Sequence, residues 1–375
     1  MMQSVGLYIH VPFCASKCAY CDFYSRVRQD QRQDYLDALL AEIGSYAPQR
    51  LRADSVFFGG GTPSLLSPEE LGRIMTALRQ AFTFTEDAEI TMEANPETVD
   101  ADYLRAGRQL GINRLSFGVQ SAVQKELSAL GRRHTFPRAV QAAEDARSAG
   151  FTNLSLDLML GIPYQTMETL RETLREVLAL RPEHLSCYLL KIEEGTPFYR
   201  KHAEALCASD DDTADFYLEV CRAMREAGYR HYEISNFARP GFESRHNLKY
   251  WRDEPYIGFG PAAHSCLSGK RFYNPADLAE YIAAGGLCGR NESEEPAGSA
   301  SERLMLGLRL SEGIDIQAIG ALDPSFSAEE QRAFLNRCKR FEKAGLLTIK
   351  DGQVALTEEG MLVSNLLLSE ILPKV

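Results

Sequence analysis

Several features are absent from this sequence, and each absence excludes a class of protein. No apolar run approaches the roughly 18 residues that a membrane-spanning helix needs. The first residues, Met1–Val5, contain no basic segment followed by an apolar one, so they do not resemble a secretory signal. Positive charge is in deficit, with 41 lysines and arginines against 52 aspartates and glutamates and a net charge of −11. Because polyphosphate repels an acidic surface, we expect no general nucleic-acid binding.

Cysteine is present in an odd number, nine in 375 residues. An odd count without a signal sequence does not suit a disulfide framework, and it indicates a reducing cytoplasm. We therefore expect a cytoplasmic protein that reaches a membrane only peripherally, through its partners. The oligomeric state is left open, a homodimer included. The apolar share of 45% and the charged share of 25% are those of a globular protein with room for a large domain and a smaller one.

Three of the cysteines, Cys14, Cys18 and Cys21, stand close together after an apolar strand, in the spacing Cys-x3-Cys-x2-Cys. Iron–sulfur clusters normally take four cysteine ligands, so three thiolates would hold three corners of a [4Fe–4S] cluster and leave one iron open to a small molecule. The alternative is a zinc ion held by the three thiolates and His10. His10 lies within the predicted strand, which makes it a poor ligand for the loop, so the cluster is the favoured interpretation.

Strand-like and helix-like segments alternate from Leu7 to about Ala227, in six rounds of roughly 30 to 50 residues. This alternation is typical of a parallel sheet with helical crossovers. Eight rounds would close a full barrel, so six predict an open, partial (β/α)6 barrel of the α/β class. The predicted strands are the segment from Leu7 and residues 55–58, 89–93, 114–120, 153–158 and 185–190.

The chemistry of such folds gathers at the carboxyl ends of the strands. The run Gly59–Thr62 follows the second strand, and glycines let a backbone approach an amino-acid-like ligand, although such a run is often only a tight turn. Glu93, Gln120 and Asp157 fall at later strand ends and would suit a cationic sulfonium, an amino group or a ribose. Arg132 would suit a carboxylate, which it can pair with through two hydrogen bonds. The alternative for each of these residues is a surface or capping role.

Beyond residue 230 the pattern becomes irregular and aromatic, and it contains His246-Asn247-x-x-Tyr250-Trp251. A histidine can ligate iron and aromatic rings can stack on a flat macrocycle. The alternative is a structural histidine with satisfied hydrogen bonds and a core tryptophan. We predict three parts: a barrel over 1–230, an aromatic-rich connecting region over 231–290, and a C-terminal domain over 291–375.

The C-terminal part follows a polar linker predicted at 285–301. Helices are expected at 301–310 and 328–344, then a hairpin with an Asp351-Gly352 turn, and then a last helix to about Leu372. Helices followed by a hairpin make this a winged-helix-like α+β domain. Because the chain is acidic, we interpret this domain as a module for protein contact or as a lid, rather than as a DNA-binding domain.

The cysteine motif, with Tyr8 before it and Tyr20 inside it, and the following Gly59–Pro63 together resemble the radical S-adenosylmethionine superfamily. Over its whole length the sequence resembles the coproporphyrinogen III oxidase-like group, and within that group it is most similar to the HemW-type heme chaperones. The motifs that carry this likeness are Cys21-Asp22-Phe23, Glu93-Ala94-Asn95-Pro96, Phe117-Gly118-Val119-Gln120-Ser121 and His246-Asn247-Leu248-Lys249-Tyr250-Trp251.

The resemblance implies three cofactors or ligands, namely a [4Fe–4S] cluster, S-adenosylmethionine and heme. It implies that Cys14, Cys18 and Cys21 hold the cluster, and that the open iron takes the amino and carboxylate groups of S-adenosylmethionine. The residues it implies for S-adenosylmethionine are Tyr8, Tyr20, Gly60, Gly61, Thr62, Glu93, Gln120, Arg132 and Asp157, and those for heme are His246, Asn247, Tyr250 and Trp251.

Two departures from the oxidase bear on function. Phe23 stands where the oxidase has a further cysteine, and the strand that begins by Leu7 leaves no room for the oxidase's preceding segment. Both departures speak against propionate decarboxylation. The resulting interpretation is a chaperone that binds heme and delivers it to respiratory-chain proteins. The alternative is an oxygen-independent coproporphyrinogen III oxidase of porphyrin biosynthesis, and whether S-adenosylmethionine is cleaved stays open.

Overall fold

The first strand, β1 (Val5–Val11), lies inside the main sheet and leads directly into the cysteine loop. It pairs in parallel with β2 (Arg52–Gly60) on one side and with β9 (Tyr256–Phe259) on the other. Six of its seven residues are buried, because a strand inside a sheet covered on both faces needs apolar side chains on both. The computed structural model describes residues 4–287, 291–292 and 297–373.

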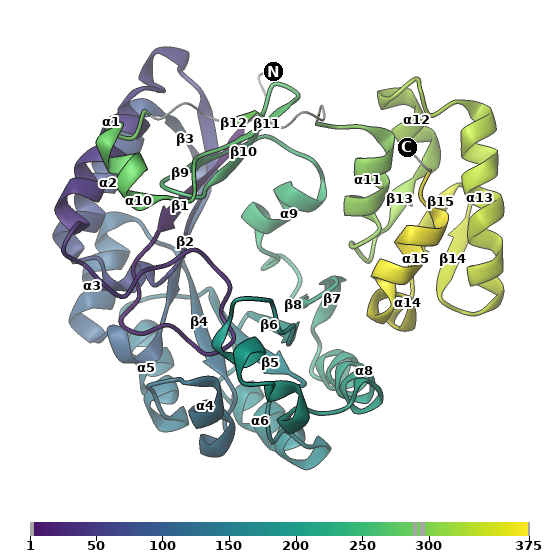
Figure 1. The fold of residues 1–375 in the computed structure, drawn as a ribbon, viewed down its shortest axis with the longest axis horizontal. Helices are drawn as coiled ribbons and strands as arrows, with labels where there is room; N and C mark the ends of the chain where they lie inside the picture. The colour runs from purple at the N-terminus through teal and green to yellow at the C-terminus, as the bar shows by residue number, and fades with distance from the viewer. Residues whose placement is uncertain (1–3, 288–290, 293–296, 374–375) are drawn as a thin grey trace.

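Strands β1 to β6 are neighbours in chain order and are all parallel, as the alternating pattern predicted. Helices cover the outer side of this curved sheet, and the strands converge on the region where the cysteine loop lies (Figure 1). The predicted fold class, a partial parallel α/β barrel, is therefore confirmed. The remaining elements of the six rounds are β3 (Thr83–Ala94), β4 (Arg114–Gln120), β5 (Leu154–Leu160), β6 (His184–Leu189), α1 (Arg32–Gly44), α2 (Pro68–Ala81), α3 (Ala101–Leu110), α4 (Gln124–Leu130), α5 (Phe136–Ser148), α6 (Met167–Ala179) and α8 (Asp210–Glu226).

Local side-chain chemistry fixes where several of these helices begin. The Ser67 side chain accepts from the Glu70 backbone N–H while Glu70 bonds back to Ser67, which completes a capping box ahead of Pro68. The Asp100 side chain caps α3 by accepting from the Tyr103 N–H, and Thr166 forms a second capping box, with Thr169, at the start of α6. The crossover helices are thus positioned by signals that lie within a few residues of their ends.

The region beyond residue 230, where the sequence pattern becomes irregular, contains short strands and helices. It supplies strands to both edges of the main sheet, where β8 (Asn236–Ala238) pairs with β6 and β9 pairs with β1. These strands have only two to four residues each, too short to show a clear sequence period. The others are β7 (Arg230–Glu233), β10 (His264–Leu267), β11 (Lys270–Tyr273) and β12 (Asn291–Glu292), and the helices of this region are α9 (Arg245–Trp251) and α10 (Leu278–Ala283).

The C-terminal unit is a small antiparallel sheet with helices, shown in yellow and green in Figure 1. Its hairpin turns at Asp351-Gly352 as predicted. The expected last helix is instead two helices that meet at Val363. Part of the predicted linker, 288–290 and 293–296, lies outside the described residues. The elements are α11 (Ala300–Gly307), β13 (Ile314–Asp315), α12 (Ile316–Leu322), α13 (Ala328–Lys343), β14 (Leu347–Lys350), β15 (Gln353–Leu356), α14 (Glu358–Leu362) and α15 (Ser364–Ile371).

The C-terminal unit packs against the β7 edge of the main sheet. The Ile234 N–H donates to the Arg309 carbonyl (3.0 Å), and the Ser311 hydroxyl donates to the His231 carbonyl (2.5 Å). No helix within the described ranges has both the length and the apolar character that crossing a bilayer requires. The division into 1–230, 231–290 and 291–375 stays a prediction, since strands from both sides of residue 230 share one sheet.

Candidate functional site

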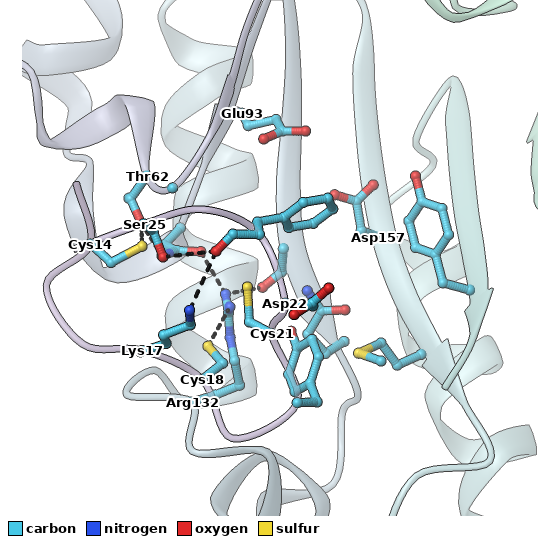
Figure 2. Close-up of a pocket in the computed structure, with 18 of the residues that line it drawn as sticks. Cys14, Lys17, Cys18, Cys21, Asp22, Ser25, Thr62, Glu93, Arg132 and Asp157 are labelled. Carbon is cyan, nitrogen blue, oxygen red and sulfur yellow. Dashed lines mark hydrogen bonds between the residues drawn. The ribbon is translucent and has the colours of Figure 1, made fainter. Parts of the chain in front are cut away.

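A cavity of about 420 Å³ lies at the carboxyl ends of the parallel strands (Figure 2). The cysteine loop closes one side of it and successive strand ends close the other. Of the twelve residues predicted for the cluster and S-adenosylmethionine, Tyr8 alone does not line this cavity. The eleven that line it are Cys14, Cys18, Tyr20, Cys21, Gly60, Gly61, Thr62, Glu93, Gln120, Arg132 and Asp157.

Backbone hydrogen bonds hold the cysteine loop at its base and at its tip. The Cys14 N–H donates to the Arg26 carbonyl (3.0 Å), so the two ends of the loop are tied together. Near the tip, the Ala19 N–H donates to the Leu130 carbonyl at the end of α4 (3.2 Å). The loop thiols therefore face the cavity from a segment that is anchored at both its base and its tip.

The spacing of the three thiols suits a polynuclear cluster better than a single ion. Within the described ranges, the one group of three metal-ligating side chains with ligand atoms within 4.8 Å of one another lies elsewhere. A tetrahedral zinc ion, with Zn–S bonds of about 2.3 Å, would need its sulfurs within about 4 Å of one another. His10 does not complete a zinc site either, since its ring nitrogens face the Tyr8 hydroxyl (3.3 Å) and the Tyr24 carbonyl (2.9 Å).

Glycine is required where the second strand meets the loop. Gly60 has a φ of +104°, and a Cβ there would lie 2.8 Å from the His10 ring. A Cβ on Gly61 would lie 2.6 Å from the Phe13 carbonyl oxygen. The N–H groups of Gly61 and Thr62 donate to the Val11 and Phe13 carbonyls (2.8 and 2.7 Å). These N–H groups consequently fasten the cysteine loop and are not free donors for a ligand.

Two polar side chains in the cavity carry buried atoms without a protein partner in the described structure. Gln120, only 8% exposed, has an unpartnered Oε1, and Arg132 has an unpartnered Nε. Gln120 also has a φ of +69°, at a point where the β4–β5 register shifts. Such backbone strain and such orphaned atoms are rare in proteins and gather at ligand sites. Both observations fit a cavity that a polar ligand completes.

Arg132 is at the same time well anchored. Its Nη2 donates to Asn95 Oδ1 and to the Gly118 carbonyl (2.7 Å each), and its Nη1 lies 3.6 Å from the Cys18 sulfur. On the other side of the loop, the Thr62 hydroxyl lies 3.6 Å from the Cys14 sulfur. Hydrogen-bond donors thus face two of the three sulfurs, as suits thiolates that carry negative charge.

Two half-buried carboxyl groups, those of Glu93 and Asp157, form the floor of the cavity. Burial, together with the nearby Asp157 carboxylate, raises the pKa of Glu93 to about 8. Burial also raises the pKa of Asp157, while the Ser116 hydroxyl donates to its carboxylate (3.0 Å) and opposes the shift. Carboxyl groups in this state gain most from a cation placed beside them. The floor therefore favours a ligand with a positive centre, such as a sulfonium or an ammonium group.

A second, smaller cavity of about 130 Å³ lies on the other side of that floor. Glu93 and Asp157 line both cavities. Tyr8, Asn247 and Tyr250 line only the smaller one, so the structure separates these three predicted residues from the cysteines.

His246 is enclosed in the protein core. Its Nδ1 lies 2.9 Å from the Ser55 hydroxyl and its Nε2 lies 2.8 Å from the Tyr250 hydroxyl. Its ring stacks on Phe57 (5.3 Å between centroids), and burial with the nearby Lys249 charge lowers its pKa to about 3. The imidazole is therefore neutral, and in this arrangement neither nitrogen is free to bind iron.

Trp251 lies away from both cavities, at the C-terminal unit, where the Arg309 guanidinium stands 5.6 Å from its ring. The four residues predicted for heme thus do not meet at one surface. That they bind heme stays a prediction.

An apolar rim at the cavity mouth was missed by the sequence analysis. Phe23 is 69% exposed, and Tyr188 and Leu189 at the end of β6 are 42% and 37% exposed, while all three line the cavity. The available signal was the apolar run Tyr188-Leu189-Leu190 at the end of β6. The lysines Lys17 and Lys191 line the same mouth.

The fold and the cavity together define a radical S-adenosylmethionine protein. The chain matches the family "Radical SAM superfamily" over residues 8–177 and the family "HemN C-terminal domain" over residues 297–363. A solved structure of coproporphyrinogen III oxidase (HemN) from Escherichia coli is similar, with a TM-score of 0.86 and 26% identity, over 98% of this chain and 90% of that one. The [4Fe–4S] cluster and S-adenosylmethionine are the cofactors that this superfamily implies.

Individual relatives narrow the assignment from the superfamily to one family within it. The heme chaperone HemW of Bacillus subtilis is 36% identical, over 96% of this chain and 96% of that protein. The heme chaperone HemW of Escherichia coli is 41% identical, over 70% of each chain. The chain belongs to the HemW family.

Proposed function

We propose that this chain is a heme chaperone of the cytoplasm, which binds heme and passes it to acceptor proteins, those of the respiratory chain among them. Its similarity to proteins named heme chaperone along nearly the whole chain supports the proposal. The observation that carries it is the cavity itself, where a polar floor for a charged cofactor opens into an exposed apolar rim.

The proposal assigns the cluster to Cys14, Cys18 and Cys21. When bound, the cluster supplies an open iron for the amino and carboxylate groups of S-adenosylmethionine and an electron for its cleavage. The chain's own residues orient and enclose that ligand. Glu93 and Asp157 attract its positive centre, and the unpartnered atoms of Gln120 and Arg132 gain hydrogen-bond partners. Tyr20 and the Gly60–Thr62 turn form the adjoining walls.

Heme docks, in this proposal, on the rim formed by Phe23, Tyr188 and Leu189. A macrocycle is flat and apolar, and covering these side chains contributes roughly 25 cal/mol for each Å² removed from water. Lys17 and Lys191 stand beside the rim with the charge that two propionates require.

The buried polar core around His246 supports the site from beneath. His246 holds Ser55 and Tyr250 in place, and Asn247 and Tyr250 line the smaller cavity under the acid pair. The C-terminal unit, 291–375, serves as the surface for protein contact.

A second candidate function is oxygen-independent coproporphyrinogen III oxidation. The structural similarity to the Escherichia coli coproporphyrinogen III oxidase over 98% of this chain favours it. The same cavity would then take a porphyrinogen as substrate.

The test uses full-length protein with its cluster reconstituted without oxygen. Heme is titrated and followed by its absorbance, first alone and then with an apo-acceptor protein present. Phe23→Ser combined with Tyr188→Ser is expected to weaken heme binding at least tenfold, because each removes apolar rim surface. Leu322→Ser, which alters an equally exposed apolar side chain on α12, is the matched control and should leave binding within twofold. Unchanged binding in the rim variant contradicts the docking site.

To test the second candidate function, coproporphyrinogen III, S-adenosylmethionine and a reductant are added to the same protein. Formation of protoporphyrinogen would favour the second candidate. Heme uptake and transfer without such a product supports the chaperone.

A further inference from the structure

Three side chains that can bind metals converge far from the cysteine loop, where the barrel meets the C-terminal unit. They are Cys221 on α8, His231 on β7 and Glu358, the first residue of α14. Their ligand atoms lie within 4.8 Å of one another, and within the described ranges they are the one group of three that does so. The set is mixed in chemistry, with a thiol, an imidazole and a carboxylate, and it joins two parts of the fold.

The imidazole of His231 is oriented toward this group. Its Nδ1 lies 4.0 Å from the Cys221 sulfur, and its ring stacks on Phe237 with centroids 4.4 Å apart. Stacking of this kind fixes the ring plane, so the direction of Nδ1 is set by packing and not by rotation in solvent.

The tautomer of His231 follows from its other nitrogen. Nε2 lies 3.4 Å from the Ile234 carbonyl and 3.4 Å from the Tyr217 hydroxyl, which itself donates to that carbonyl (2.9 Å). Both neighbours of Nε2 can therefore only accept, so Nε2 carries the proton. The Nδ1 lone pair is left to face Cys221. A histidine that donates from one nitrogen to a carbonyl and offers the other is the arrangement found at metal sites.

We propose that Cys221, His231 and Glu358 bind one divalent transition-metal ion of the zinc class. Thiolate, imidazole and carboxylate are the ligand types that zinc takes, and three protein ligands leave the fourth tetrahedral position to water. On binding, the Cys221 thiol releases its proton to solvent and the sulfur–metal bond forms, with no change of oxidation state.

Arg225 is the group that competes with the ion. Its Nη2 lies 2.5 Å from each carboxylate oxygen of Glu358. The arginine side chain is mostly exposed, so it can keep one oxygen while the ion takes the other. The ion would then cross-link α8 and β7 of the barrel to α14 of the C-terminal unit, and its effect would be on the stability of that junction.

The test uses full-length protein with its cluster reconstituted, so that the cysteine loop is already filled. Zinc is titrated in competition with a chromophoric chelator. We expect one equivalent to bind and to raise the thermal midpoint, as any ligand specific to the folded state does. Glu358→Gln and His231→Gln should each weaken zinc binding at least tenfold and abolish the rise. Glu359→Gln alters an exposed neighbour outside the group and should change neither.

A cobalt experiment reports on the sulfur directly. In a Cys14/Cys18/Cys21→Ala background, Co²⁺ should produce a thiolate charge-transfer band in the near ultraviolet that is lost on adding Cys221→Ser. Because Cys221 is buried, Cys221→Ser can unfold the chain, and Glu358→Gln then serves as the deciding variant. Absence of zinc binding, or full binding in Glu358→Gln, would overturn the site and leave a hydrogen-bonded cluster only.

Discussion

The cavity at the cysteine loop and the core around His246 are both rich in polar side chains. They differ in whether those side chains have hydrogen-bond partners within the protein. In the cavity, Gln120 and Arg132 have buried atoms without a partner. In the core, both nitrogens of His246 are bonded, and the Lys249 ammonium lies between Asp54 (2.9 Å) and Glu254 (3.2 Å). Unpartnered buried groups destabilise a fold unless something completes them. The comparison therefore favours ligand binding at the cavity and a structural role for His246.

The largest expected effect is on the cysteine loop. Replacing Cys14, Cys18 and Cys21 together with alanine should abolish iron incorporation, because no other cysteine among the described residues lines the cavity. Iron content and visible absorbance after anaerobic reconstitution give the measurement. Cys207→Ala, a half-buried cysteine outside the cavity, is the control and should still take up four irons per chain. If the triple variant still takes up iron and turns brown, the cluster does not bind in the cavity.

The next effect concerns the core. His246→Ala should lower the free energy of unfolding by about 3 kcal/mol, since it leaves a void and strips Ser55 and Tyr250 of a partner. Heme affinity of the folded protein should change less than threefold. Denaturant unfolding and heme titration separate the two quantities, and His202→Ala at an exposed histidine should alter neither. A variant that loses heme while keeping its stability would reverse the assignment and make His246 a heme residue.

A smaller effect tests the floor of the cavity. If a cationic ligand binds only beside ionised Glu93, whose pKa is about 8, its affinity follows the ionised fraction. That fraction rises from about a tenth at pH 7 to about nine tenths at pH 9, so S-adenosylmethionine affinity should increase about tenfold. Calorimetric titration across this range measures it.

Glu93→Gln should make that affinity independent of pH over the same interval. Glu97→Gln is the matched control, because His134 lies 3.3 Å away and the pKa of Glu97 is lowered despite partial burial. The pH dependence should persist in this control. A flat profile in the unmodified protein would show that the positive centre lies away from Glu93.

The smallest expected effect concerns the free energy of unfolding that the fold loses because the cavity contains strained and unpartnered groups. Gln120→Gly relieves the left-handed backbone and removes an unpartnered oxygen, so stability should rise by up to about 1 kcal/mol. Affinity for S-adenosylmethionine should fall in the same variant. Arg181→Gly, at another positive φ in a turn, should gain stability without losing affinity. Loss of stability in Gln120→Gly would mean that Gln120 is structural, as we expect His246 to be.

The sequence predicted most of what is encoded locally. The six strands could be read from apolar runs, and the starts of α2, α3 and α6 from Ser67, Asp100 and Thr166. Because parallel strand ends meet at one edge, the same reading placed nine of the eleven cavity residues together, while Tyr20 and Arg132 followed from the family resemblance.

What the sequence could not predict depends on partners distant in the chain. Strands β8 and β9 are three and four residues long and gain their structure from β6 and β1. The burial of His246 depends on Ser55 and Phe57, nearly two hundred residues earlier. The final helix was expected to be continuous because its apolar residues continue past Val363, where the chain turns instead.

The position of β1 between β2 and β9 has a consequence for biosynthesis. Gly6 pairs with Ser55, which is made soon after it, but it pairs with Tyr256 only after most of the barrel has been made. At about 5–20 residues per second, the strand that leads into the cysteine loop therefore has one unpaired edge for roughly 10–40 s of translation. Translation thus leaves an interval in which the strand before the cysteine loop is held in the sheet along one edge only, until β9 is made.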